Sequence, residues 1–130
     1  MEVKGKVFDD KEVMSPAERR EHYNKQVSSI VNYAYQNIPA IREKMNEAGI
    51  QPEQINTVED LELVPTTTRD EIIEKQKATP PFGGFLAIPR EKIYRILYSP
   101  GPIYVPLASP KYAESVRRLY HAAGINQSDV

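Results

Sequence analysis

The sequence predicts an α+β fold in which a mostly helical N-terminal part, a helical hairpin plus short helices, leads into a strand-loop-helix unit. Apolar residues recur at spacings of three and four through most of residues 15–76, and helix-capping signals precede them, which is typical of amphipathic helices. One run, Ile93 to Tyr98, is instead β-branched, aromatic or aliphatic apart from Arg95, and turn residues bound it. Such a run predicts a largely buried strand.

The composition limits the class of protein. At 130 residues the chain is one domain by length, and 17 Lys and Arg against 18 Asp and Glu leave a net charge of -1. Because no block of basic residues occurs, a nucleic-acid partner is not expected. The absence of cysteine excludes disulfides and thiolate metal sites. Without a secretory leader or a run of 18 apolar residues, we expect a cytoplasmic protein that makes no membrane contact.

The chain is predicted to divide into three segments. Residues 1–14 read as an N-terminal arm that packs through Val7, Phe8 and Val13. Residues 15–76 form a helical subdomain. Residues 77–130 contain a loop, the strand, a second loop and a last helix. Eleven prolines fall mostly between these periodic stretches and mark the joints.

The first helix has the clearest signal. Ser15 is followed by Pro16 and, three residues on, by Glu18, which together predict a capping box with proline at the first helical position. The helix should end near Asn37, before Pro39. Its predicted apolar stripe consists of Tyr23, Val27, Ile30, Val31, Ala34 and Ile38.

Shorter elements follow. A second helix over Ala40 to Ala48 should stop at Gly49 and complete the hairpin. A capping box at Thr68 to Glu71 opens another helix that runs to about Gln76. Between them we expect a turn at 51–56 anchored by Ile50 and Ile55, a single helical turn from Thr57, and an extended linker at 61–67 whose apolar residues dock on the first two helices.

Gly83 and Gly84 allow two interpretations. Adjacent glycines permit positive φ and a close backbone approach, so they could form a phosphate cradle. The alternative is a turn that buries Phe82 and Phe85, and this is favoured because no full nucleotide-binding fingerprint surrounds the pair.

The segment after the predicted strand is the main candidate site. Pro100, Pro102 and Pro106 lack a backbone donor, so Ser99 to Pro106 should be a loop that cannot continue a central strand. A helix is predicted from Pro110 to Ala123. α/β enzymes often hold phosphates where a strand leads through a loop into a helix.

Other polar residues have ordinary structural explanations. His22 and His121 lie far apart without a metal-binding motif, and the pairs Glu59-Asp60 and Asp70-Glu71 occupy first helical turns, where capping accounts for them. Tyr23 and Tyr120 should pack in the core. Arg95, within an apolar run, needs an acidic partner or a position at an edge.

Several short motifs together resemble one family. They are Tyr33 to Pro39, Glu47 to Ile50, Thr57 to Leu61 with Leu63 to Thr67, and Pro81 to Gly83 leading to Ile88 to Glu91. In this order they resemble the N-terminal part of phenylacetate-CoA ligase and its relatives, including the coenzyme F390 synthetases, in the adenylate-forming acyl-CoA synthetase superfamily. The resemblance implies a fragment of a larger adenylate-forming ligase domain.

The resemblance also assigns a role to the loop. In that family the corresponding loop is rich in Ser, Thr and Gly, ends in Lys-Pro and wraps the ATP phosphates, so Ser99, Gly101 and Tyr104 become the phosphate-loop counterpart. Here Pro102 and Ile103 replace two threonines, Tyr104 replaces a glycine and Val105 replaces the lysine. These changes remove hydroxyls, amide donors and the cation that would meet a triphosphate.

The implied activity of the parent protein is ATP-dependent activation of a carboxylic acid, an aromatic acid such as phenylacetate, as an acyl-adenylate that then passes to coenzyme A. Its implied cofactors are ATP, Mg and coenzyme A, none of which we expect the fragment to bind, and its catalytic residues lie outside the matched part. Residues 126–130 resemble a turn entering a new strand, so we expect a chain cut from a longer ligase, inactive alone, rather than a natural short relative. The alternative function is a non-catalytic interaction module, in which an exposed strand edge supports a homo-oligomer.

Overall fold

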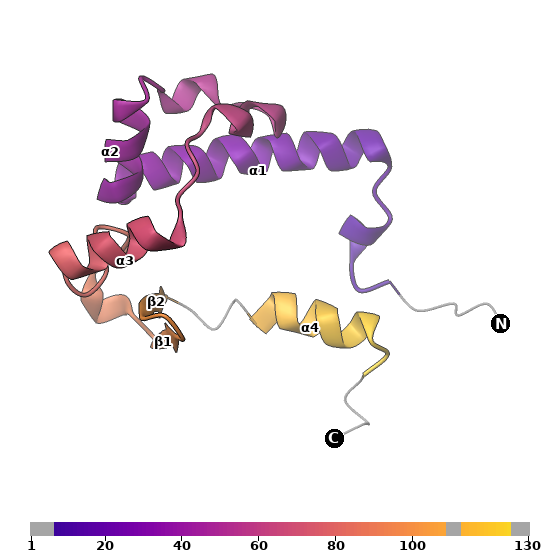
Figure 1. The fold of residues 1–130 in the computed structure, drawn as a ribbon. Coiled ribbons are helices and arrows are strands. Elements are labelled where there is room, and N and C mark those ends of the chain that lie inside the picture. The colour runs from indigo at the N-terminus through magenta and orange to yellow at the C-terminus, as the bar shows by residue number, and fades with distance from the viewer. Residues whose placement is uncertain (1–6, 109–112, 126–130) are drawn as a thin grey trace.

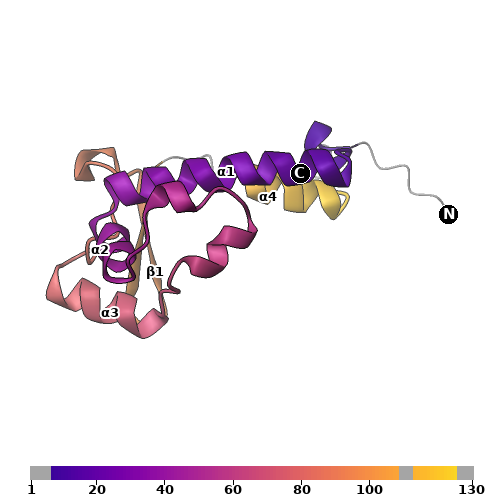
Figure 2. The ribbon, with the colours of Figure 1, turned by 90° about the horizontal axis from the view of Figure 1, so that it is seen from above.

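The computed structural model describes residues 7–108 and 113–125. The predicted α+β class is confirmed: four α-helices and several 3-10 helices accompany one two-stranded sheet in these residues (Figure 1). Helix α1 (Pro16–Asn37) is the longest element, and α2 (Pro39–Glu47) and α3 (Arg69–Ala78) gather at its C-terminal end (Figures 1 and 2). The strands are β1 (Arg95–Ser99) and β2 (Ile103–Leu107), and α4 (Ala113–Ala122) follows.

Local capping explains where α1 begins and ends. The Ser15 Oγ accepts a hydrogen bond from the Glu18 amide at 3.3 Å, and the Glu18 carboxylate accepts one from the Ser15 amide at 2.8 Å. The predicted capping box is therefore present, with Pro16 in the first turn. Ile38 alone separates α1 from α2, because Pro39 cannot continue α1 and starts the next helix.

The core is small and lies where α1, α2 and the segment after α2 meet. Met45 and Ile55 are 1% and 0% exposed, and the predicted anchor role of Ile55 is confirmed. Ile50, the second predicted anchor, packs against the same cluster. The buried members of this cluster are Val27, Val31, Met45 and Ile55.

Several apolar side chains predicted to be covered are exposed. Tyr23 and Ile30 on α1 are 52% and 59% exposed, although Val27 and Val31 of the same predicted stripe are buried, so the covered face of α1 is narrower than that stripe. Leu61 and Leu63 belong to a 3-10 helix (Glu59–Leu63) rather than to an extended linker, and both are exposed. Within that stretch, Val64 packs against the core.

The N-terminal arm packs through one of its three predicted residues. Val7 and Val13 are exposed, whereas the Phe8 ring lies 5.4 Å from the His121 ring and 4.7 Å from the Arg118 guanidinium carbon. Arg118 also forms an ion pair with Asp9. Tyr120 is 51% exposed on α4, so its predicted core role, like that of Tyr23, is wrong.

The predicted strand-loop-helix unit is instead a β-hairpin followed by a helix. β1 and β2 pair antiparallel, with Ser99 opposite Ile103 and Arg95 opposite Leu107. The run at Ile93 to Tyr98 does form a strand, but Ile96, Leu97 and Tyr98 are exposed because no further layer covers the hairpin within the described residues. The predicted last helix begins at Ala113 within the described part, and the predicted turn at 126–130 lies outside it.

In the ranges 7–108 and 113–125 no helix is long and apolar enough to cross a membrane. The division at residues 14 and 76 stays a prediction.

Candidate functional site

The hairpin turn occupies the place of the predicted phosphate loop. It consists of Pro100, Gly101 and Pro102, and Gly101 has a φ of +102°, which a residue with a side chain rarely adopts. Both flanking prolines lack an N–H. The turn is therefore a rigid corner that presents few backbone donors.

Arg69 binds this turn from the first position of α3. Its Nη2 donates a hydrogen bond to the Pro100 carbonyl oxygen, and its guanidinium lies where a Cβ on Gly101 would be. The φ of Gly101 favours glycine, whereas a Cβ there would require only a shift of the exposed Arg69 side chain. Arg69 therefore places a positive charge beside the turn, although Arg69 itself lies outside the loop.

Gln76, in the last turn of α3, holds the second strand. Its side-chain nitrogen donates to the Tyr104 carbonyl oxygen at 2.9 Å, and its side-chain oxygen accepts from the Tyr104 amide at 2.9 Å. Gln76 is 7% exposed, and both of its polar groups are satisfied by this pair. In Figure 1, α3 lies between α2 and the hairpin, so α3 connects the core to the hairpin.

These bonds explain how Pro106 can lie within a strand. Since both backbone groups of Tyr104 face α3, Tyr98 and Tyr104 form a pair that shares no ladder hydrogen bond. The pattern alternates, so Ile96 and Pro106, two positions along, form another such pair. The missing N–H of Pro106 would point to the outer edge of β2, where no ladder bond is lost, and the expectation of a continuous loop from Ser99 to Pro106 is wrong for this reason.

The three predicted site residues lie on the hairpin. Ser99 is half-buried at the end of β1, Gly101 is the apex of the turn, and the Tyr104 ring lies 5.1 Å from the Tyr98 ring. Of the donors that a phosphate loop would offer, the Tyr104 amide is bonded to Gln76, and the prolines have none. This turn therefore offers fewer backbone donors than a phosphate loop without prolines would, and the assignment of Ser99, Gly101 and Tyr104 to a phosphate loop stays a prediction.

An ion pair orders the start of α3. The Lys44 ammonium on α2 lies 2.8 Å from the Glu71 carboxylate, and it also donates to the carbonyl oxygen of Thr66. Together with the Thr68 amide, Lys44 lowers the pKa of Glu71 to about 2. Glu71 thus caps α3 and joins it to α2, which places Arg69 beside the hairpin turn.

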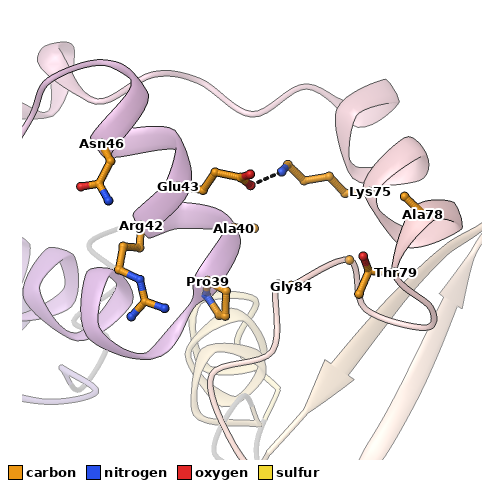
Figure 3. Close-up of a pocket in the computed structure, with 10 residues that line it drawn as sticks. Pro39, Ala40, Arg42, Glu43, Asn46, Lys75, Ala78, Thr79 and Gly84 are labelled. Atoms are coloured by element: carbon orange, nitrogen blue, oxygen red, sulfur yellow. Dashed lines mark hydrogen bonds and ion pairs between the residues drawn. The ribbon is translucent and has the colours of Figure 1, made fainter.

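A cavity of about 580 Å³ lies between α2, the end of α3 and the turn at Gly83 and Gly84 (Figure 3). Glu43 and Lys75 form an ion pair across it. A Cβ on Gly83 would lie 2.7 Å from the Gln76 backbone nitrogen, and the Gly84 carbonyl accepts from the Ala40 amide at 3.2 Å.

The two glycines therefore allow close contact with the helices. The Gly83 amide donates to the Thr79 carbonyl oxygen at 2.8 Å, so this donor is not available to a phosphate. The turn interpretation is confirmed: Phe82 is 5% exposed, and Phe85 is half-buried.

The other residues singled out from the sequence have structural roles. Arg95 is exposed, with its guanidinium carbon 5.6 Å from the Tyr94 ring centroid, so it lies at an edge rather than beside an acid. Asp60 accepts from the amides of Asn56 and Thr57, which lowers its pKa and confirms the capping role. Across residues 7–108 and 113–125, no cluster of His, Asp and Glu side chains could hold a metal ion.

Sequence reasoning missed Arg69 and Gln76. Gln76 shares a helical face with the half-buried Ile72 and Ile73, which is a weak signal for a buried amide. Arg69 lies inside the capping motif, and nothing in the sequence links it to a turn 31 residues later.

Comparison with known proteins identifies relatives that resemble nearly the whole of this chain but are several times longer. No family model matches the chain. The phenylacetate-coenzyme A ligase of Pseudomonas putida is 27% identical over 130 aligned positions, covering 95% of this chain and 28% of that protein. The corresponding enzyme of Thermus thermophilus is 32% identical over 102 positions, covering 73% of this chain and 22% of that protein.

Solved structures of a CoA ligase are also similar to this chain. A crystal structure of 2-hydroxyisobutyryl-CoA ligase in the postadenylation state with 2-HIB-AMP superposes with a TM-score of 0.81 at 30% identity, over 87% of this chain and 25% of that chain. Another, with 2-HIB-AMP and CoA in the thioesterification state, gives a TM-score of 0.78 at 28% identity.

The chain therefore belongs with the N-terminal region of adenylate-forming ligases. Within that class, it is related to the phenylacetate-CoA ligase-like enzymes. It spans about a quarter of the length of the relatives it matches.

Proposed function

We propose that this chain supplies the N-terminal region of an ATP-dependent acid-CoA ligase, which activates a carboxylic acid as an acyl-adenylate and transfers it to coenzyme A. The observation that carries this proposal is the TM-score of 0.81 at 30% identity to a ligase in complex with its acyl-adenylate. ATP, Mg and coenzyme A are the cofactors of the complete ligase. The 130-residue chain alone is inactive, because the proposed chemistry needs the rest of a ligase.

The proposed substrate class is an aromatic acid such as phenylacetate. The support for it is that the curated relatives are phenylacetate-coenzyme A ligases. The solved structures are of a ligase for 2-hydroxyisobutyrate, an aliphatic acid, so the two acids form a natural pair of test substrates.

A chimera tests this proposal. This chain replaces the matching N-terminal region of the Thermus thermophilus ligase, and pyrophosphate release is measured with phenylacetate, with 2-hydroxyisobutyrate and without acid. We expect release that depends on phenylacetate. A folded chimera without acid-dependent release over a broad panel of acids would contradict the proposal.

A second candidate is a non-catalytic interaction module, and the chemistry of the hairpin turn favours it. The Tyr104 amide is bonded to Gln76, and the prolines at 100 and 102 have no donor, so the turn is built for packing rather than for phosphate. For this candidate the chimera is inactive, and it stays inactive when the threonines, glycine and lysine typical of the family are restored at positions 102–105.

A further inference from the structure

The two edges of the hairpin differ. The outer edge of β2 is covered, because Gln76 binds both backbone groups of Tyr104 and Pro106 has no N–H. In the part of the chain that the structure describes, no strand pairs with the outer edge of β1. By the alternation of the ladder, the backbone N–H and C=O groups of Ile96 and Tyr98 point to that edge.

The hairpin also leaves apolar side chains exposed on both faces. Ile96 and Tyr98 are 49% and 61% exposed, and Leu97 and Val105, on the other face, are 44% and 41% exposed. A two-stranded hairpin is marginal in water, and it gains stability from further strands that extend its apolar faces. An open apolar edge of this kind is a template for another strand.

We infer that a second copy of this chain pairs with β1, antiparallel, across a two-fold axis at Leu97. In that register Ile96 lies opposite the partner's Tyr98, and the outward backbone groups of each can bond those of the other. Arg95, the only charged residue from 95 to 107, lies opposite the partner's Ser99, so no like charges meet. The edge is thus complementary to itself.

The covered edge of β2 limits the assembly. Among the described residues each copy has one open strand edge, so pairing produces a four-stranded sheet and ends at the dimer, rather than continuing into a fibre. The inference goes beyond the proposed function, and it concerns the 130-residue chain itself, so it stands or fails independently of any ligase assay.

The test combines light scattering with hydrogen exchange on the 130-residue chain over a hundredfold range of concentration. We expect a monomer at low concentration and a dimer at high concentration, and the amides of Ile96 and Tyr98 should become protected only in the dimer. The Leu97 amide, which faces β2, is an internal control and should be protected at both concentrations.

Two proline variants supply the matched test. Ile96→Pro and Tyr98→Pro each remove an outward donor while sparing the ladder to β2, as Pro106 does in the native chain, and each should stay monomeric with unchanged helical circular dichroism. Leu119→Ser, which removes an exposed apolar side chain from α4, should still dimerise.

Three results overturn the inference. They are a monomer at every concentration, dimerisation that survives in a folded proline variant, and a dimer whose Ile96 and Tyr98 amides exchange as fast as in the monomer. Should both proline variants unfold, the exchange of these two amides in the unmodified chain decides the question.

Discussion

Gln76 binds both backbone polar groups of Tyr104, with 2.9 Å from its Nε2 to the carbonyl oxygen and 2.9 Å from its Oε1 to the amide nitrogen. This pair joins α3 to the hairpin and leaves the other edge of the hairpin open. It also uses an amide that a phosphate loop would need.

Gln76→Ala should weaken the attachment of the hairpin. The substitution leaves the Tyr104 N–H and C=O without their partner, which costs about 1 to 3 kcal/mol of unfolding free energy. Urea denaturation measures the loss, and hydrogen exchange should show a faster Tyr104 amide. Lys77→Ala, at the exposed neighbouring position, is the control and should change stability by less than about 0.5 kcal/mol. Equal stabilities of the two variants would refute the role given to Gln76.

Gly101→Ala should destabilise the chain mainly through its backbone conformation. Its φ of +102° is strained for alanine, and the new Cβ meets the Arg69 guanidinium. Gly49→Ala is the comparison, because its φ of +71° lies close to the left-handed region that alanine can adopt and open space surrounds it. We expect Gly101→Ala to cost about 1 kcal/mol more unfolding free energy than Gly49→Ala, and Arg69→Ala to leave that excess unchanged, because the flexible end of the exposed Arg69 side chain can move away from a Cβ. Loss of the excess in the Arg69→Ala background would show that the clash, rather than the backbone conformation, is its cause.

Glu71 should make the unfolding free energy of the chain depend on pH in the acid range. Its carboxylate has a pKa of about 2 in the folded chain, lowered from 4.5 chiefly by Lys44. A carboxyl group with a lowered folded pKa contributes its stability above the unfolded pKa, and that contribution is lost as the pH falls through the folded pKa. Unfolding free energy should therefore fall between about pH 4.5 and pH 2, and Glu71→Gln should flatten the profile in that window.

Two controls accompany this profile. Glu62→Gln, at an exposed position of the 3-10 helix, should leave the slope unchanged. Lys44→Met should reduce the slope, because it removes the largest cause of the lowered pKa of Glu71. Identical profiles for the native chain and Glu71→Gln would contradict the assignment.

The isolated chain should not bind Mg-ATP measurably by calorimetry. The hairpin turn has two prolines without donors, a Tyr104 amide bonded to Gln76, and an Arg69 guanidinium bonded to the Pro100 carbonyl oxygen. Micromolar affinity would contradict this prediction and show that the turn offers a nucleotide site. Inorganic pyrophosphate and AMP, titrated separately, would then show which part of the nucleotide is bound.

The helices were predictable because their signals are local. The capping boxes at Ser15 and Thr68 are read from four consecutive residues and appear as predicted. The strand at Arg95–Ser99 was also predictable, from its β-branched and aromatic run. The exposure of this strand was not predictable, because the burial of a strand depends on neighbouring elements that its own residues do not specify.

The hairpin contacts were beyond sequence reasoning for a related reason. A proline excludes a central strand but not an outward position on an edge, and only the pairing register shows which of these Pro106 occupies. Arg69 and Gln76 reach partners 31 and 28 residues away, so no local pattern marks them. The apolar stripe predicted for α1 was wrong at Tyr23. The helical period of apolar residues shows which face of a helix is apolar, but not how much of that face a neighbouring element covers.

The central proposal is that this chain supplies the N-terminal region of an acid-CoA ligase and that a packed hairpin takes the place of the phosphate loop. The most direct test compares the chimera carrying the native hairpin with the same chimera carrying Pro102→Thr, Ile103→Thr, Tyr104→Gly and Val105→Lys, by the kcat/KM for ATP in phenylacetate-dependent pyrophosphate release. One restored charge-assisted contact is worth about 1.5 to 3 kcal/mol, so we expect the restored chimera to be at least about tenfold more active. Equal activity of the two folded chimeras would contradict the claim.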